Sequence, residues 1–226
     1  MSKYSSFTYQ IWINGALMSS DRMEMITDIV YEDNCTGSDL LTITICDPNL
    51  KFFGDNVILH GAKIKFEAKH TYTNTITTTS FSGYIDVIDI DFPNTGVPTM
   101  TINCMDESFN MDRKPKKRTW EKKKVSDVVS QIFGEYGLSK KIDATSTTED
   151  NITQSNTTDM QFLIELASNQ KEDYLCFIKD KTGYFVKKDR GTSPQKTLNY
   201  RQDPFDIYSF SPRITLDPIE DEDAKK

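Results

Sequence analysis

The hydrophobic residues between positions 119 and 186 follow two helical periods and then a strand period. Six apolar residues recur at helical spacing, and Gly137 follows them as a stop signal because glycine accepts the left-handed conformation. This pattern predicts an amphipathic helix whose apolar stripe is Val125, Val128, Val129, Ile132, Phe133 and Tyr136.

A second stripe predicts another helix over residues 159–170, with Thr157 or Thr158 as its N-cap and Asp159 at its positive end. Its inward residues are Met160, Leu163, Leu166 and Ala167, with Phe162 flanking them. The polar residues 139–158 before it read as a loop or an irregular strand. Residues 174–187 then predict a β-hairpin that turns at residues 180–183.

No helical period is present before residue 119, and the apolar residues there alternate as in strands. Turn signals, such as Asn14-Gly15, separate these runs. Apolar parity changes between Val87 and Ile88, which predicts a β-bulge that bends the strand. The predicted strands cover residues 7–13, 40–46, 62–71, 81–92 and 98–104.

This pattern predicts an α+β, mainly β chain with three parts. Residues 1–112 are expected to form a small antiparallel barrel or sandwich, and residues 113–195 an α/β insert of two helices and a hairpin. Residues 196–226 are expected to add a C-terminal strand, near 205–214, followed by an acidic tail.

The threonine-rich residues 71–80 predict a long, exposed hairpin, because threonine favours strands although the segment has too little apolar content to form core. We expect this hairpin to form an interface with another subunit. The predicted interface residues on it are Tyr72, Thr73, Thr75, Thr77 and Thr78.

The composition is that of a folded protein, with 226 residues, 37% hydrophobic residues and a net charge of −7. No apolar run is long enough to span a membrane, and the N-terminus shows no signal peptide. The four cysteines are widely scattered, without a C-x-x-C pair, which favours free thiols over disulfides or zinc ligands.

The charge includes one basic block, residues 113–124, with eight basic residues in twelve. Three interpretations remain open. Lys114, Lys116, Lys117 and Arg118 could contact phosphates while Trp120 stacks on a base. The block could instead be a solvated linker with a buried tryptophan, or a docking surface for an acidic partner.

Catalytic motifs are absent from the sequence, which contains no nucleophile elbow, zinc-protease motif or phosphate-binding glycine loop. His60 and His70 lie among ordinary polar neighbours near strand ends. Asp86, Asp89 and Asp91 lack a glycine-centred calcium loop. We therefore expect no enzyme, cofactor, metal or small-molecule substrate, and no membrane or general nucleic-acid binding.

The helix, polar gap, helix and hairpin resemble the middle region of the phage late control gene D and baseplate hub family. The similarity covers about 70 residues and lies mostly in core and capping positions. The matching residues are Thr119, Trp120, Val125, Ile132, Gly137 and Leu138, then Gln154, Ser155, Asp159, Phe162, Leu163, Leu166 and Ala167, and finally Gly183, Tyr184 and Phe185.

The resemblance implies a homo-oligomeric, trimeric hub in the tail baseplate of a virion, made in the bacterial cytoplasm. Its implied partners are the tail tube protein, the central spike, and a baseplate wedge or tape measure protein. The resemblance also implies that residues 1–112 form the family's tube-like antiparallel β-barrel and that residues 196–226 add a strand to a partial second barrel or to the first barrel. Relatives continue through a complete second barrel, so we expect this barrel to be reduced here or supplied by another chain, and the 71–80 hairpin to reach an adjacent subunit or tube ring. The alternative is a peptidoglycan-binding, LysM-like module of a tail-associated cell-wall protein.

Overall fold

The computed structural model describes residues 5–52, 58–72, 75–171 and 173–188. All of these residues belong to the first of two compact units, residues 1–188. The predicted strand at 205–214 and the acidic tail lie outside the described residues. The predicted boundaries at 112/113 and 195/196 stay predictions.

The first part of the chain is a seven-stranded antiparallel sheet with the order β2-β1-β5-β6-β7-β4-β3. Two short helices, α1 (Ser20–Met23) and α2 (Phe109–Asp112), flank its strands in the sequence. The strands are β1 (Ser5–Ile13), β2 (Ala16–Leu17), β3 (Ile26–Glu32), β4 (Leu40–Cys46), β5 (Lys63–Tyr72), β6 (Thr75–Asp91) and β7 (Thr99–Met105).

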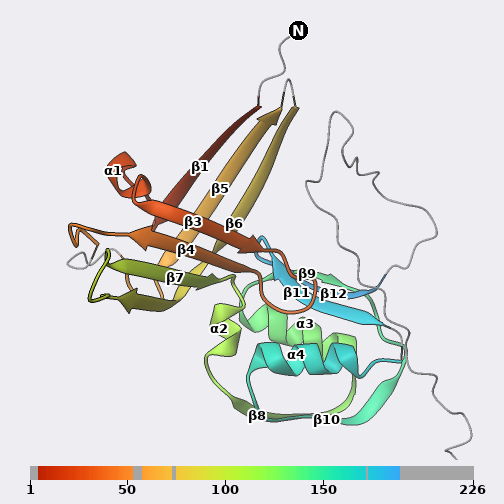
Figure 1. Cartoon of the computed structure of the whole chain (residues 1–226). Coiled ribbons are helices and arrows are strands. Elements are labelled where there is room, and N and C mark those ends of the chain that lie inside the picture. The colour runs from red at the N-terminus through yellow and green to blue at the C-terminus, as the bar shows by residue number, and fades with distance from the viewer. Residues whose placement is uncertain (1–4, 53–57, 73–74, 172, 189–226) are drawn as a thin grey trace, which may run out of the picture. The chain divides into compact units, whose positions relative to one another are not determined.

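Alternation along these strands separates a buried face from a solvent-exposed face. In β4, for example, Leu41, Ile43 and Ile45 are fully buried, whereas the residues between them are partly exposed. The buried faces of the strands share one hydrophobic core. Beyond that core, β1, β5 and the first half of β6 project together as a three-stranded extension (Figure 1).

Two local predictions in this sheet are confirmed. The pairing of β6 with β7 shifts register between Ile85 and Val87, directly before the parity change from which a β-bulge in this strand was expected. Asn14 and Gly15 both have positive φ, 50° and 84°, which is the geometry of a tight hairpin turn between β1 and β2.

Two expectations need correction. The described strands form an open sheet ending at β2 and β3, not the closed barrel that was predicted. The strand β3 was also not predicted. Its register with β4 shifts between Ile26 and Asp28, and this irregularity interrupts the alternation by which a strand is recognised in sequence.

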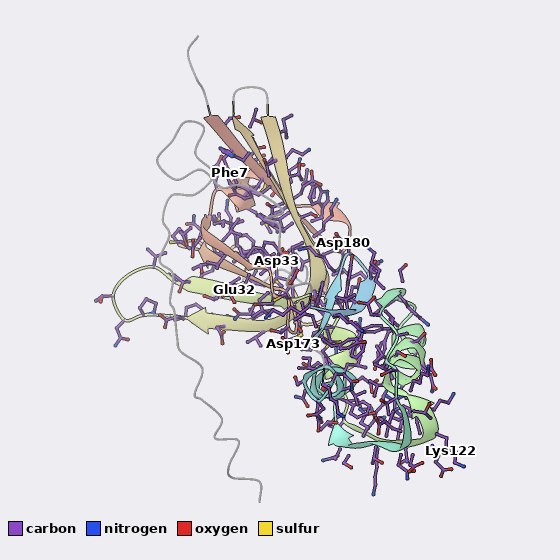
Figure 2. The ribbon with its side chains drawn as sticks, turned by 90° about the vertical axis from the view of Figure 1, so that its right-hand side faces the viewer. Phe7, Glu32, Asp33, Lys122, Asp173 and Asp180 are labelled. Atoms are coloured by element: carbon purple, nitrogen blue, oxygen red, sulfur yellow. The ribbon has the colours of Figure 1, made fainter. Side chains whose placement is uncertain are left out.

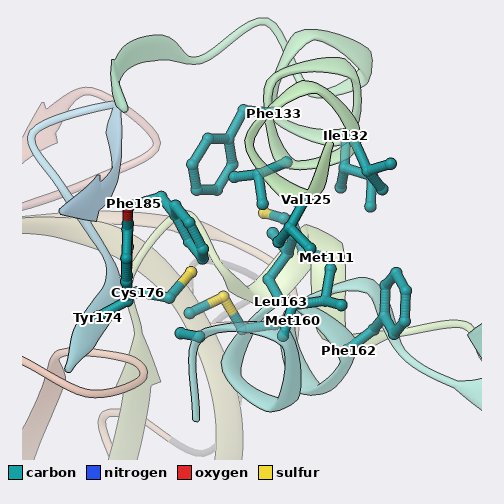
Figure 3. Packing of buried hydrophobic residues seen from close by; sticks show 14 of the residues in the cluster. Met111, Val125, Ile132, Phe133, Met160, Phe162, Leu163, Tyr174, Cys176 and Phe185 are labelled. Atoms are coloured by element: carbon teal, nitrogen blue, oxygen red, sulfur yellow. The ribbon is translucent and has the colours of Figure 1, made fainter. Parts of the chain in front are cut away.

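The insert is built around a second core, formed by both helices and the strands beside them (Figure 3). The helices α3 (Val125–Glu135) and α4 (Asp159–Ser168) bury the two predicted stripes. Strand β9 (Ser139–Ile142) pairs in parallel with β12 (Thr182–Lys187), which pairs antiparallel with β11 (Tyr174–Lys179).

The glycine stop after α3 is confirmed, and of the two candidate N-caps of α4 the structure has Thr158, while α4 ends at Ser168 and not at Gln170. Gly137 has a φ of 67° just beyond α3, as a helix stop requires. Thr158 caps α4 in a capping box, since its hydroxyl accepts from the Gln161 amide and the Gln161 side chain accepts from the Thr158 amide. Phe162 was expected only to flank the core, but it is buried.

The basic block is not a linker. Residues 116–124 form strand β8 (Lys116–Lys124), which pairs antiparallel with β10 (Thr148–Thr157). Residues 139–158 were predicted to form a loop or an irregular strand. Their second half is strand β10, which has one register shift, between Ser155 and Thr157. Buried Trp120 and Ile152, opposite one another, hold this two-stranded sheet against the helices.

Candidate assembly surface

The hairpin that carries the first group of predicted interface residues is present at the end of the extension. Tyr72 pairs with Thr75 in register, and the exposed Thr77 and Thr78 pair with His70 and Lys69. Thr73 lies outside the described residues. The hairpin thus joins β5 to the half of β6 that extends beyond the hydrophobic core.

This part of β6 has one hydrogen-bonding edge without a partner strand among the described residues. Residues 75–83 pair with β5 on one side, and pairing with β7 begins only at Tyr84. On the opposite side of the extension, β2 covers β1 only at Trp12 and Ile13. Residues 5–10 of β1 therefore present a second edge that pairs with no other strand of the described ranges.

Neither edge carries the residues that usually discourage strand pairing. Residues 5–13 of β1 and 75–85 of β6 contain no charged residue and no proline. By contrast, β3 at the end of the sheet carries Asp28 and Glu32. The two uncharged edges are therefore the surfaces of the sheet best suited to pairing with another chain.

An apolar groove of about 280 Å³ runs beside the β1 edge and is bordered on its other side by β3. Phe7, Tyr9 and Phe66 contribute aromatic rings to it, and Ile26 and Tyr31 come from β3. Phe7 is 61% exposed and projects from the extension (Figure 2). The alternation of residues 7–13 did not identify Phe7 as a surface residue, because exposure depends on where the core ends.

The second group of predicted interface residues has a different role. Lys116 and Arg118 on β8 point inward, toward the fully buried carboxylate of Asp159 at the start of α4. Lys116 Nζ lies 2.6 Å from Asp159 Oδ2, and Arg118 Nη2 contacts Asp159 Oδ1. The Tyr136 hydroxyl (2.6 Å) and Gln154 Nε2 (3.0 Å) donate to the same carboxylate.

These contacts fix the charge state of the cluster. Burial by itself would raise the pKa of Asp159, but the hydrogen bonds from Lys116, Tyr136 and Gln154 outweigh it and lower that pKa. Burial would lower the pKa of Lys116, but its bonds to Asp159 and Tyr136 raise it. Lys116 and Arg118 therefore stabilise the insert and are not free for phosphates; Lys114 and Lys117 remain exposed.

Trp120 is likewise part of the insert core. Its ring stacks on Phe162, with the centroids 5.7 Å apart and an angle of 9° between the ring planes. The guanidinium carbon Cζ of Arg118 lies over the Trp120 ring, 4.9 Å from its centroid. A buried ring cannot also stack on a nucleotide base. The structure therefore favours a packing role over the phosphate-and-base interpretation of the basic block.

Reactive groups in the described residues are few. No cluster of three or more His, Cys, Asp or Glu suited to a metal is found there. All four cysteines are free, and burial raises the pKa of Cys104 and Cys176 to about 12, so neither is a thiolate at neutral pH. His60 lies 3.9 Å from Asp86 as a surface pair. None of the described helices is long and apolar enough to span a membrane.

Residues 5–215 match the family described as Alg8 N-terminal domain, which is nearly the whole chain. The chain belongs to the Alg8 N-terminal domain family. No curated protein matches it. This family name differs from the late control gene D family that the sequence motifs resemble. The solved structures with a similar fold are nevertheless tail proteins, in agreement with the coarser prediction of a tail-protein fold.

Solved tail proteins share the fold of this Alg8 N-terminal domain chain. The 43 kDa tail protein of prophage MuSo2 from Shewanella oneidensis superposes with a TM-score of 0.56 at 10% identity, covering 80% of this chain and 53% of that one. The tail protein from Neisseria meningitidis MC58 superposes with a TM-score of 0.52 at 13% identity, covering 85% of this chain and 54% of that one.

A third relative is the E. coli c3393 protein, which superposes with a TM-score of 0.51 at 13% identity, covering 84% of this chain and 52% of that one. That protein is described as a component of the type VI secretion system with structural similarity to the T4 bacteriophage tail proteins gp27 and gp5. The Alg8 N-terminal domain chain spans about half the length of each of these three relatives.

Proposed function

We propose that this chain forms a ring in the baseplate hub of a phage tail or a tail-like particle, between the tail tube and the central spike. The observation that carries the proposal is the pair of unpaired, uncharged edges on opposite sides of one three-stranded extension, in a fold shared with tail proteins. The proposed role is structural and involves no catalysis.

The two edges are compatible with one another between copies. Strands β1 and β6 both run antiparallel to β5, so they run in the same direction. Rotation about an axis along the strands would place the β6 edge of one copy beside the β1 edge of the next, in parallel. Such a head-to-tail interface joins two different surfaces, and it closes into a ring when the rotation closes.

We propose a trimer in which strand pairing between copies completes the tube-like barrel that the described strands leave open. One end of the ring would meet the tail tube protein and the other the spike, with a wedge or tape measure protein as a further partner. Exposed Lys114 and Lys117 could face an acidic region of one of these partners. The particle would be assembled in the bacterial cytoplasm, and the chain would reside in the tail baseplate of the virion.

Edge substitutions test the proposal. Phe7, His70 and Thr77 lie in one row across the extension, on β1, β5 and β6. Phe7→Lys or Thr77→Lys should abolish rings seen by light scattering and electron microscopy, because each places a charge at the joint. Phe7→Lys combined with Thr77→Glu should restore them through opposite charges across the joint.

His70→Lys is the matched control, since it adds a charge to the same row on a strand that is paired on both sides. It should leave the ring intact. The proposal is wrong if the unmodified chain is a stable monomer that never enters a tail, or if both edge lysine variants still form rings.

A further inference from the structure

Two carboxylates are buried side by side at the ends of adjacent strands. Asp39 precedes β4 and Asp106 follows β7, and the two residues are only 4% and 5% exposed. The Asp39 amide donates to Asp106 Oδ2 at 2.8 Å, and the Asp106 amide donates to the Asp39 carbonyl oxygen at 3.2 Å. The Ser108 amide donates to Asp106 Oδ1 at 2.8 Å.

The hydrogen bonds to these two carboxylates come from neutral groups, and the charge of Lys179 acts on Asp39 without a salt bridge between them. Asp39 accepts from the Tyr31 hydroxyl and the Asn34 amide, both at 2.8 Å. Neither Asp39 nor Asp106 takes part in an ion pair with any described lysine, arginine or histidine. A buried carboxylate such as Asp106 without an ion-pair partner among the described residues is costly, so a proton on Asp106 relieves the cost of burial and the repulsion from Asp39.

The pair lies where the sheet meets the insert. Residues 33–39 connect β3 to β4, and the Gly37 amide in this loop donates to the Cys176 carbonyl oxygen on β11 at 3.2 Å. Ser38 and Ser108 share a hydrogen bond between their hydroxyls. We call the 33–39 loop, residues 106–108 and strand β11 the junction.

The charged groups around the junction lie at its rim. Asp33 pairs with Lys179, and Glu107 lies 3.9 Å from Lys181, while Asp180 is near enough to Tyr31 to influence it. Asp33 and Asp180 are labelled in Figure 2, where the loop and the β11–β12 hairpin approach each other. Asp33, Asp180 and Lys181 are solvent-exposed, Lys179 is partly exposed and Glu107 is 17% exposed, so salt and water screen these side chains more than they screen the buried pair.

We propose that Asp106, buried beside Asp39, makes the junction sensitive to protons, so that uptake of one proton near mildly acidic pH strengthens the attachment of the insert to the sheet. The proton weakens the hydrogen bonds that Asp106 accepts from the Asp39 and Ser108 amides, but it removes a charge that is buried at the base of the 33–39 loop, and this is the larger effect. This inference does not depend on ring formation.

The direction follows from linkage. Burial, only partly offset by hydrogen bonds, raises the pKa of Asp106 to about 6 from 3.8. A pKa that is raised on folding adds stability that is fully present below the unfolded value and is lost as pH rises through about 6. The closed junction is therefore favoured at pH 5 and less favoured at pH 7.5.

Hydrogen exchange of the full-length protein tests this inference. After correction for intrinsic rates, the Gly37 and Asp39 amides should be about tenfold better protected at pH 5.0 than at pH 7.5, the factor that follows from the two pKa values. A ¹³C-carboxyl titration of the unmodified protein should show Asp106 changing in the same range. Unchanged protection, or an Asp106 that titrates near its ordinary value, would overturn the proposal.

Asp106→Asn should remove the pH dependence of protection, whatever its effect on overall stability. Glu107→Gln is the matched control, because it removes a rim charge next to Asp106 and should retain the tenfold change. If the pH dependence persists in Asp106→Asn, another group controls the junction and the proposal fails.

Discussion

Arg118 and Asp159, forty-one positions apart, form a hydrogen-bonded ion pair that joins strand β8 to the first turn of helix α4. The Asp159 side chain is completely buried, whereas that of Arg118 is 23% exposed and also contacts Glu135. A basic residue in a run that looks like a solvated surface block is therefore an internal connection of the insert.

Replacing this carboxylate should destabilise the protein. In Asp159→Asn the cations Lys116 and Arg118 keep only Glu135 as an acidic partner. We expect a loss of about 2 kcal/mol, below the 3–5 kcal/mol typical of fully buried pairs because both cations are partly solvated. Urea denaturation at pH 7 measures it.

The same variant should also change the pH dependence of stability. Since the pKa of Asp159 is lowered on folding, its contribution is present above the ordinary value of 3.8 and is lost as pH falls below it. The difference between Asp159→Asn and the unmodified protein should therefore shrink below about pH 4. A difference that stays constant down to pH 3 would contradict this assignment.

Two adjacent threonines should respond in opposite ways to loss of the hydroxyl. Thr158→Val removes the cap of α4 and the bond to Asp112, and should cost about 1 kcal/mol or more. Thr157→Val removes a buried hydroxyl that has no hydrogen-bond partner, so stability should stay equal or rise. Thermal unfolding of both variants compares them directly; equal losses would argue against the capping box.

Alanine substitutions at Gly83 and Gly134 should have opposite effects on stability. A Cβ on Gly83 would lie 2.1 Å from the Met105 carbonyl oxygen, so Gly83→Ala must displace the backbone where β6 approaches β7. We expect a loss of about 3 kcal/mol or failure to fold. In Gly134→Ala the nearest group is the flexible end of Lys140, and helix propensity should add up to about 1 kcal/mol. Melting temperatures distinguish the two.

Trp120 should be inaccessible to nucleic acid and to quenchers. With Trp12→Phe, Trp120 is the only tryptophan left, and its stacking on Phe162 in the core predicts blue-shifted emission with weak acrylamide quenching. Adding a single-stranded oligonucleotide at low salt should leave this emission unchanged. A saturable change would revive the base-stacking interpretation of the basic block.

The hairpin of the extension should matter for assembly and not for folding. Deleting residues 72–79 removes its tip while leaving Phe66 and Phe81 of the core in place. We expect monomers with an unchanged circular dichroism spectrum, since the removed residues lie beyond the core. Rings that form as before would show that this hairpin reaches no neighbour.

The sequence by itself determined the local elements whose signals are periodic. The stripes of α3 and α4, the stop at Gly137, a threonine cap at position 157 or 158 and a bulge in β6 near Val87 all follow from side-chain spacing and backbone preference, which act over a few residues. It also indicated the tail-protein fold through residues that mostly form the core.

The tertiary structure decided which polar residues are exposed and which strand edges are unpaired. Charge pattern alone could not show that Lys116 and Arg118 turn inward, because their partner Asp159 comes from a distant helix. Likewise, the β1 and β6 edges are open only because β2 and β7 end where they do. Burial and edge exposure depend on long-range pairing, and that pairing is absent from any local pattern.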